Sequence, residues 1–231
     1  MQQYTTPPQW LEALAWISLI VAFMSVFYIL YDIFVRQYRQ KMAIMEVVYP
    51  VTALYFGPLA VWFYHKYGRM KSIKQHSQHN NDGKIHWHQT SEAVSHCGAG
   101  CTIGDIIGEW LVFALGITIL GSALYADFLF AFVFAWTLGI VFQYLTIVPM
   151  QNLGKLQGIW QAIKADTLSI VAFQVGLFAG MYYYQEILFD NPLSKTTASY
   201  WFLMQLAMIL GFFTAYPVNK WLVKRGIKEA M

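Results

Sequence analysis

The stretch SHCGAGCTIGDIIGEW, residues 95–110, opens an apolar run and holds both cysteines of the 231-residue chain, one histidine and two carboxylates. Cys97, Cys101, Asp105 and Glu109 recur at every fourth position. On an α-helix each such step turns about 40° beyond a full circle, so the four side chains form one stripe about 18 Å long. The spacing therefore predicts a helix that carries thiols and carboxylates along one face.

Glycines recur at the same interval on the adjoining face of this predicted helix. Gly100, Gly104 and Gly108 form a doubled G-x-x-x-G pattern. Such a pattern lets the backbone of another helix approach closely inside a membrane. We expect tight packing on this side, and the face is also a candidate contact for a second copy of the chain or for a membrane partner.

The composition excludes an ordinary soluble globule. Hydrophobic residues make up 58% of the chain and charged residues only 12%, which is too little polar surface to cover a fold in water. A formal net charge of +3 gives no indication of nucleic-acid binding. The first apolar run has no preceding basic residue and no small-residue cleavage site, so we interpret it as a membrane helix rather than a signal peptide.

The apolar runs predict an all-α, polytopic membrane protein. A helix needs about 20 residues to cross a hydrocarbon core of about 30 Å. We expect two N-terminal membrane helices within residues 1–64, a polar, histidine-rich cytoplasmic linker over residues 65–95 and a four-helix membrane domain over residues 96–231. The six predicted spans cover residues 10–34, 43–64, 101–125, 128–149, 168–189 and 200–222.

The positive charges favour a cytoplasmic C-terminus in the cytoplasmic membrane of a bacterium. With six spans and both termini inside, eleven Lys and Arg residues lie in the cytoplasm and four outside. The basic loop RQYRQK, residues 36–41, is then on the outer side. If the run 43–64, broken by Pro50 and by Gly57-Pro58, were re-entrant, the distribution would become fourteen against one. Because proline and glycine are tolerated in membrane helices, we predict six spans.

All six histidines lie within 32 residues, from His65 to His96. Imidazole is a common ligand of Zn, Cu and Ni, so the His76-x-x-His79 and His86-x-His88 pairs could capture a metal loosely for delivery to the cysteines. Their spacing matches no closed structural zinc site, and a solvated loop whose histidines bind nothing explains them equally well.

Several functions compete for the stripe. The leading hypothesis is binding or translocation of Cu(I) or Zn(II), because soft thiolates suit these ions and intramembrane carboxylates commonly mark ion or proton paths. The alternatives are a thiol-redox membrane enzyme, an enzyme acting on a lipid-borne substrate, and a non-catalytic assembly subunit whose cysteines only pack. The predicted metal-binding residues are His96, Cys97, Cys101, Asp105, Glu109 and Asp166. His96 does not share the helical face of Cys97, so its participation requires a distorted turn.

Polar residues on later spans suggest a shared polar interior. Asp166, Ser169 and Gln174 fall within one helical face, and Asp166 is at the same end of the membrane as the cysteines. Asn219 approaches that end on the last span. We expect Asp166, Gln174 and Asn219 to share one polar interior with Asp105 and Glu109.

Together, SHCGAGCTIGDIIGEW, FQYLTIVPM, KADTLSIVAFQVGLFAGM and YWFLMQLAMILGFFTAYPVNKWLVKRGIKEAM resemble successive motifs of the bacterial domain-of-unknown-function 4396 family. The resemblance covers about residues 90–231 and implies a four-helix membrane unit without an established activity. It also implies that Gln174 stands where Glu is usual and Lys220 where Trp is usual. If the family moves protons or cations through that Glu, the neutral Gln174 departs from the pattern at that step.

Overall fold

Five helices are long and apolar enough to cross a membrane in the computed structural model, which describes residues 4–69, 72–73, 86–151, 154–189 and 192–228. Without water in the bilayer core, a helix is the simplest way to pair every backbone N–H and C=O within one segment. The chain is therefore an all-α, multi-pass membrane protein. The five long helices are α1 (Gln9–Phe34), α4 (Trp87–Leu115), α5 (Ala123–Gln151), α6 (Lys155–Tyr182), continued by η3 (Tyr183–Leu188), and α7 (Ala198–Lys224).

The predicted second span is wrong. Residues 43–64 form α2 (Met45–Phe56) and α3 (Pro58–Phe63), and α3 continues as η1 (Tyr64–Gly68). Gly57 separates the two helices with a φ of +53°. Glycine adopts this backbone conformation readily, and Pro58 follows at the first position of α3, where its missing N–H costs nothing.

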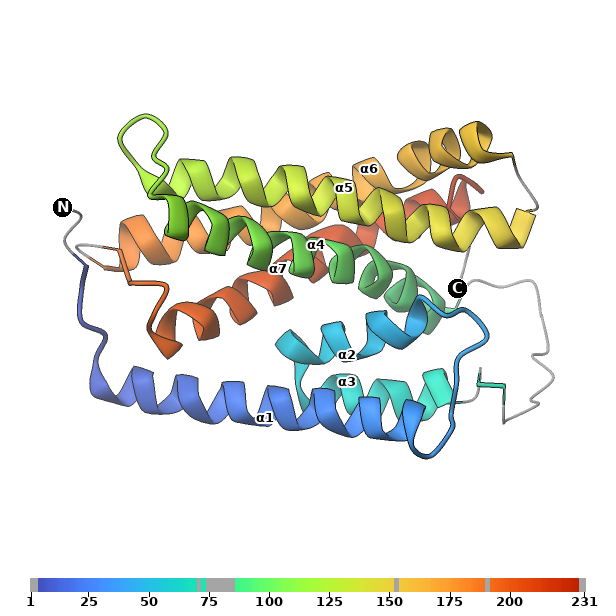
Figure 1. Ribbon diagram of the computed structural model, residues 1–231, viewed down its shortest axis with the longest axis horizontal. Coiled ribbons are helices and arrows are strands. Elements are labelled where there is room, and N and C mark those ends of the chain that lie inside the picture. Colours follow the sequence, from blue (N-terminus) through green and yellow to red (C-terminus); the bar gives the residue numbers. More distant parts are fainter. Residues whose placement is uncertain (1–3, 70–71, 74–85, 152–153, 190–191, 229–231) are drawn as a thin grey trace.

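The two short helices form a re-entrant hairpin. At 12 residues, α2 is about 18 Å long, which is too short to cross the hydrocarbon core. It returns from the end of α1 to the middle of the molecule, and α3 runs back to the same end (Figure 1). With five candidate spans instead of six, the N-terminal and C-terminal ends of the chain lie at opposite ends of the bundle (Figure 1).

Helix α4 begins fourteen residues before the predicted span. His86 caps it in a capping box with Gln89, so the last part of the predicted linker is helical. Thr90 and Glu92 in this first part are buried, which their polar character did not indicate. The helix ends at Gly116 in the left-handed conformation, and the predicted end at residue 125 lies already in α5.

The glycine face of α4 packs against α5 of the same chain. A Cβ at Gly100 would lie 2.9 Å from the Cα of Gly139, and one at Gly108 would lie 2.6 Å from the backbone nitrogen of Ala131. The close approach that the glycines predict is therefore confirmed. Because α5 of the same chain occupies this face, the contact of these glycines with a second chain or a membrane partner has no support in the fold and stays a prediction.

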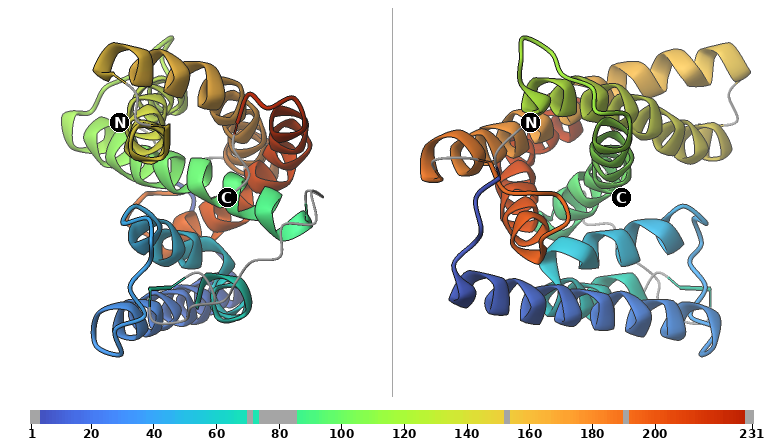
Figure 2. Two further views of the ribbon diagram at one scale, coloured as in Figure 1. Left: turned by 90° about the vertical axis from the view of Figure 1, so that its right-hand side faces the viewer. Right: turned by 60° about the vertical axis from the view of Figure 1, so that its left-hand side comes forward.

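Helix α4 lies at the centre of the molecule. It contacts α5, α6, α7 and α2, and over half of its most apolar segment is buried. Helices α4–α7 lie together, while α1 and the hairpin cover them from one side, where α1 also contacts α7 (Figure 2). This position places the side chains of the opening stretch inside the bundle.

Candidate functional site

Buried polar side chains follow α4 from one end to the other, and we call this set the polar column. Every member is at most 3% exposed. Because they recur at about every turn of α4, they form a line through the bundle rather than one cluster. The members on α4 are Glu92, His96, Cys97, Cys101, Asp105 and Glu109.

At the outer end of the column, meaning the end near the N-terminus, one lysine holds two carboxylates. Lys195 Nζ lies 2.8 Å from Glu109 Oε2 and 2.5 Å from Asp127 Oδ1 on α5. Tyr200 on α7 donates a hydrogen bond of 2.5 Å to the same Glu109 oxygen. One ammonium group therefore faces two carboxyl groups, so this end can hold one further positive charge or proton.

A cavity of about 200 Å³ adjoins this outer group. Asp127, Lys195 and Tyr200 line it together with Gln185. Gln185 accepts a hydrogen bond from the backbone N–H of Leu193, but its buried Nε2 has no partner. A buried donor without a partner usually marks the place of a water molecule or ligand.

In the middle of the column Asp105 faces an amide instead of a cation. Gln174 Nε2 on α6 donates a hydrogen bond of 2.8 Å to Asp105 Oδ1. The second carboxyl oxygen of Asp105 and the amide oxygen of Gln174 have no partner. An ionised carboxylate is costly inside a membrane without a counter-ion, so the neutral, protonated form of Asp105 suits this position better.

The two thiols occupy the turns next to Asp105. Both are free and fully buried, and Cys101 follows Cys97 by about one turn of α4. The α2 residue Tyr55 reaches this level of α4, because a Cβ at Gly98 would lie 3.0 Å from its hydroxyl oxygen. Reactive thiols are usually accessible, so this burial argues against the thiol-redox hypothesis.

At the inner end, meaning the end near the C-terminus, a second lysine enters the bundle from the chain segment after α7. Gly226, with a φ of +67°, reverses the chain, and Lys228 becomes fully buried. Its Nζ lies 2.6 Å from Asp166 Oδ1 on α6 and donates a hydrogen bond of 2.9 Å to Asn219 Oδ1. It also donates to the backbone carbonyl of Ala93, so Lys228 links α4, α6 and α7.

Between this ion pair and α5 lies a set of polar atoms without partners. His96 Nε2 is 2.9 Å from Thr146 Oγ1, whereas its Nδ1 has no partner. Both side-chain polar atoms of Gln143 and the Oδ2 of Asp166 also have none. A Cβ at Gly139, one turn before Gln143, would lie 3.5 Å from that Asp166 oxygen, so Asp166 reaches the face of α5 that carries Gln143.

Residues 86–228 match the family model described as Domain of unknown function (DUF4396). The chain belongs to the DUF4396 family. The match begins at the cap of α4 and reaches Lys228, so it includes the whole polar column and both lysines. It leaves out α1 and the re-entrant hairpin. No curated protein and no solved structure matches the chain.

In this DUF4396 protein, the predicted metal-binding residues are spread along the length of the bundle instead of meeting at one point. Glu109 binds Lys195, Asp166 binds Lys228, and His96 turns towards Thr146 on α5. In the described part of the chain, no group of three or more His, Cys, Asp or Glu side chains is arranged to hold a metal ion. The expectation that Asp105, Gln174, Asp166 and Asn219 share the interior of the bundle is confirmed.

The other histidines form no common site in the described residues. His65 contacts Tyr28 and Arg69, while His86 and His88 stack on one another. His76 and His79 lie outside the described residues. The predicted metal capture by the histidine-rich stretch therefore stays a prediction.

Sequence reasoning missed the two lysines and Asp127. Lys195 carried one signal, because it is the sole basic residue on the outer side in the re-entrant arrangement. Lys228 follows a glycine that permits a reversal, but the same pattern is common at helix ends. Asp127 stands alone among apolar residues of α5, and only its long-range partner reveals its role.

Proposed function

We propose that this DUF4396 protein carries protons through the membrane along the polar column of α4. The observation that supports this proposal most is the series of buried polar atoms without partners at His96, Asp105, Gln143, Asp166 and Gln174. Buried polar groups normally have partners, so such a series marks places for water molecules that connect the fixed groups. Intramembrane carboxylates arranged in this way are typical of proton paths.

The spacing of the column fits water-assisted transfer. Side chains four residues apart on α4 are about 6 Å apart along the axis, which is too far for a direct hydrogen bond but is spanned by one water molecule. Carboxyl, imidazole and thiol groups at these steps can each accept and release a proton. The outer cavity beside Lys195, Glu109 and Asp127 would connect the column with water on that side.

The charge distribution supports an inner membrane orientation with the C-terminus in the cytoplasm. In the described part of the chain, every Lys and Arg except Lys195 lies in one of four places: after the end of α1, in or just after η1, in the first three turns of α6, or in the last two turns of α7 and beyond. These places share one end of the bundle (Figure 1). The positive-inside rule assigns this end to the cytoplasm and the N-terminus to the outer side.

Transition-metal binding is the second candidate, and one observation favours it. Cys97 and Cys101 are free, buried and about one turn apart on α4, and two thiolates suffice for Cu(I). Zn(II) normally requires four ligands, which the neighbouring side chains do not complete. Copper bound in a 1:1 ratio by the wild type and lost in the Cys97→Ser, Cys101→Ser variant would favour this function over proton transfer.

Proton transfer is tested in liposomes that contain the purified protein and an internal pH-sensitive dye. A potassium gradient with valinomycin supplies the driving force. We expect acidification faster than in empty liposomes, and a reduction of at least tenfold in Asp105→Asn, because the amide keeps its size and loses the exchangeable proton. Glu46→Gln is the control, since Glu46 is also buried but binds Arg39 away from the column.

A Gln174→Glu variant extends the same assay. It replaces an amide that cannot take up a proton with a carboxyl group beside Asp105, so we expect faster transfer than in the wild type. Wild-type liposomes that acidify no faster than empty ones would refute the proposed function. Equal rates in the wild type and Asp105→Asn would refute the role of the column.

A further inference from the structure

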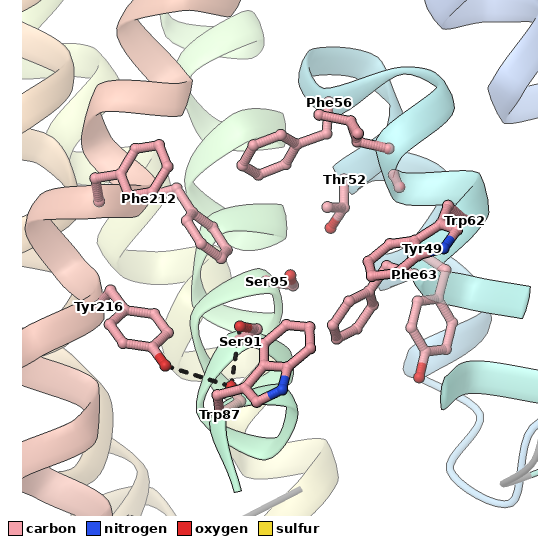
Figure 3. A pocket seen from close by; sticks show the side chains of 13 residues that line it. Tyr49, Thr52, Phe56, Trp62, Phe63, Trp87, Ser91, Ser95, Phe212 and Tyr216 are labelled. Carbon is pink, nitrogen blue, oxygen red and sulfur yellow. Dashed lines mark hydrogen bonds between the residues drawn. The ribbon is translucent and has the colours of Figure 1, made fainter. Parts of the chain in front are cut away.

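A second cavity lies on the other side of α4, between the re-entrant hairpin and α7 (Figure 3). Its volume is about 390 Å³, within the usual range of small-molecule sites. The hairpin, the first three turns of α4 and the second half of α7 each contribute to its walls. It is separate from the polar column, although Tyr49 on its wall donates a hydrogen bond to the column residue Glu92.

Aromatic rings form most of the wall. Phe56 and Phe212 meet edge to face with their ring centres 5.0 Å apart at one end of the cavity. Phe63 and Trp87 meet in the same manner at 6.0 Å at the other end (Figure 3). Flat rings present π faces, which attract another flat ring more specifically than they attract an acyl chain.

Among the hydroxyl groups of the cavity, that of Thr52 is buried without a partner. Ser91 and Tyr216 both donate hydrogen bonds to the backbone carbonyl of Trp87. Thr52 on α2 is 7% exposed, and its hydroxyl has no partner although it points into the cavity (Figure 3). A buried hydroxyl costs free energy until it is hydrogen-bonded, so this side chain is a donor for a ligand.

The cavity is also without charge. All the described residues that line it are apolar, aromatic or hydroxyl-bearing, and none is Asp, Glu, Lys or Arg. A charged ligand would therefore enter this space without compensation. A fitting ligand is neutral, dissolves in the membrane, has a flat ring, and carries an oxygen that accepts a hydrogen bond.

We propose that this cavity binds a neutral lipid-soluble ring compound of the quinone class, with one carbonyl oxygen accepting a hydrogen bond from Thr52. The aromatic walls hold the ring between the hairpin and α7. This proposal concerns binding alone. It does not depend on proton transfer through the column.

Equilibrium dialysis of the purified protein against 2-methyl-1,4-naphthoquinone tests the binding. We expect one bound molecule per chain and an affinity five- to tenfold weaker in Thr52→Val, which keeps the shape and removes the donor. An Ala60→Phe variant fills the cavity and should abolish binding. The control Thr137→Val makes the same change on the exposed side of α5 and should bind like the wild type.

Thermal melting of each variant in the same detergent shows whether it is folded, and the comparison uses only variants that melt like the wild type. No saturable binding of the naphthoquinone by the wild type would overturn the proposal. Equal binding by the wild type and Thr52→Val would contradict the proposed hydrogen bond from Thr52 to the ligand. Displacement of the naphthoquinone by an equal concentration of 1-dodecanol would show a lipid-chain site instead, which also contradicts the proposal.

Discussion

At the residue scale, the two carboxylates in the middle and inner parts of the column face opposite kinds of partner. Asp166 is bound to the ammonium group of Lys228, whereas Asp105 has only the amide of Gln174. Protonation of a carboxylate in an ion pair breaks the pair, whereas a carboxyl group beside an amide can gain or lose a proton without breaking an ion pair. The first arrangement therefore suits structure, and the second suits transfer.

This contrast predicts different costs for losing the partner. Lys228→Met leaves Asp166 buried without a counter-charge, and we expect a loss of about 3–5 kcal/mol in the free energy of unfolding. The double variant Lys228→Met, Asp166→Asn removes both charges and should recover a large part of that loss. Unfolding in mixed detergent and SDS micelles measures both, and a double variant no more stable than the single one would contradict the ion-pair account.

At the element scale, the sequence predicts a helix well where the residues that form the pattern lie within that helix. The four-residue spacing of Cys97, Cys101, Asp105 and Glu109 predicted one buried stripe, and the glycines predicted a close helix contact. The re-entrant alternative for residues 43–64 was weighed but not chosen, because α2 and α3 together are as long and apolar as a true span. Only the backbone turn at Gly57 divides them. The start of α4 was missed because its polar first turns are satisfied by distant partners such as Tyr49.

The α4–α5 contact also predicts which glycine tolerates a methyl group least. A Cβ at Gly104 would overlap the backbone of Phe134 and Ala135, which cannot move without displacing α5. We expect Gly104→Ala to lower the free energy of unfolding by about 1–3 kcal/mol. Gly154→Ala at the cap of α6 is the control, because its nearest neighbour would be 3.9 Å away.

Gel filtration of these two glycine variants in detergent separates packing within the chain from assembly between chains. A wild-type oligomer that falls apart in Gly104→Ala without loss of stability would place the contact between chains. An unchanged oligomeric state with lower stability is the expected result.

At the scale of the whole molecule, long-range partners decide what a residue does, and these partners are what the sequence could not supply. Lys195 is 86 residues from Glu109, and Lys228 is 62 residues from Asp166. Both contacts arise only when α4–α7 pack together. The sequence therefore predicted most of the buried residues of the column, while the folded bundle determined which of their carboxylates face a lysine.

The arrangement of the helices predicts on which side of the membrane each loop lies. Because α2 and α3 turn back at Gly57, the loop after α1 lies at the same end as the C-terminus, and the N-terminus lies at the opposite end (Figure 1). The basic residues Arg36, Arg39 and Lys41 then lie on the positively charged side, which removes the disagreement with the positive-inside rule that six spans created.

Site-directed labelling tests this arrangement. Single cysteines replace Gln37 and Lys224 in a Cys97→Ser, Cys101→Ser background and are labelled in intact cells with a membrane-impermeant maleimide. We expect neither to react until the membrane is opened, whereas a cysteine at Thr196, before α7, should react at once. Immediate labelling at position 37 would restore the six-span arrangement and show that the hairpin crosses the membrane.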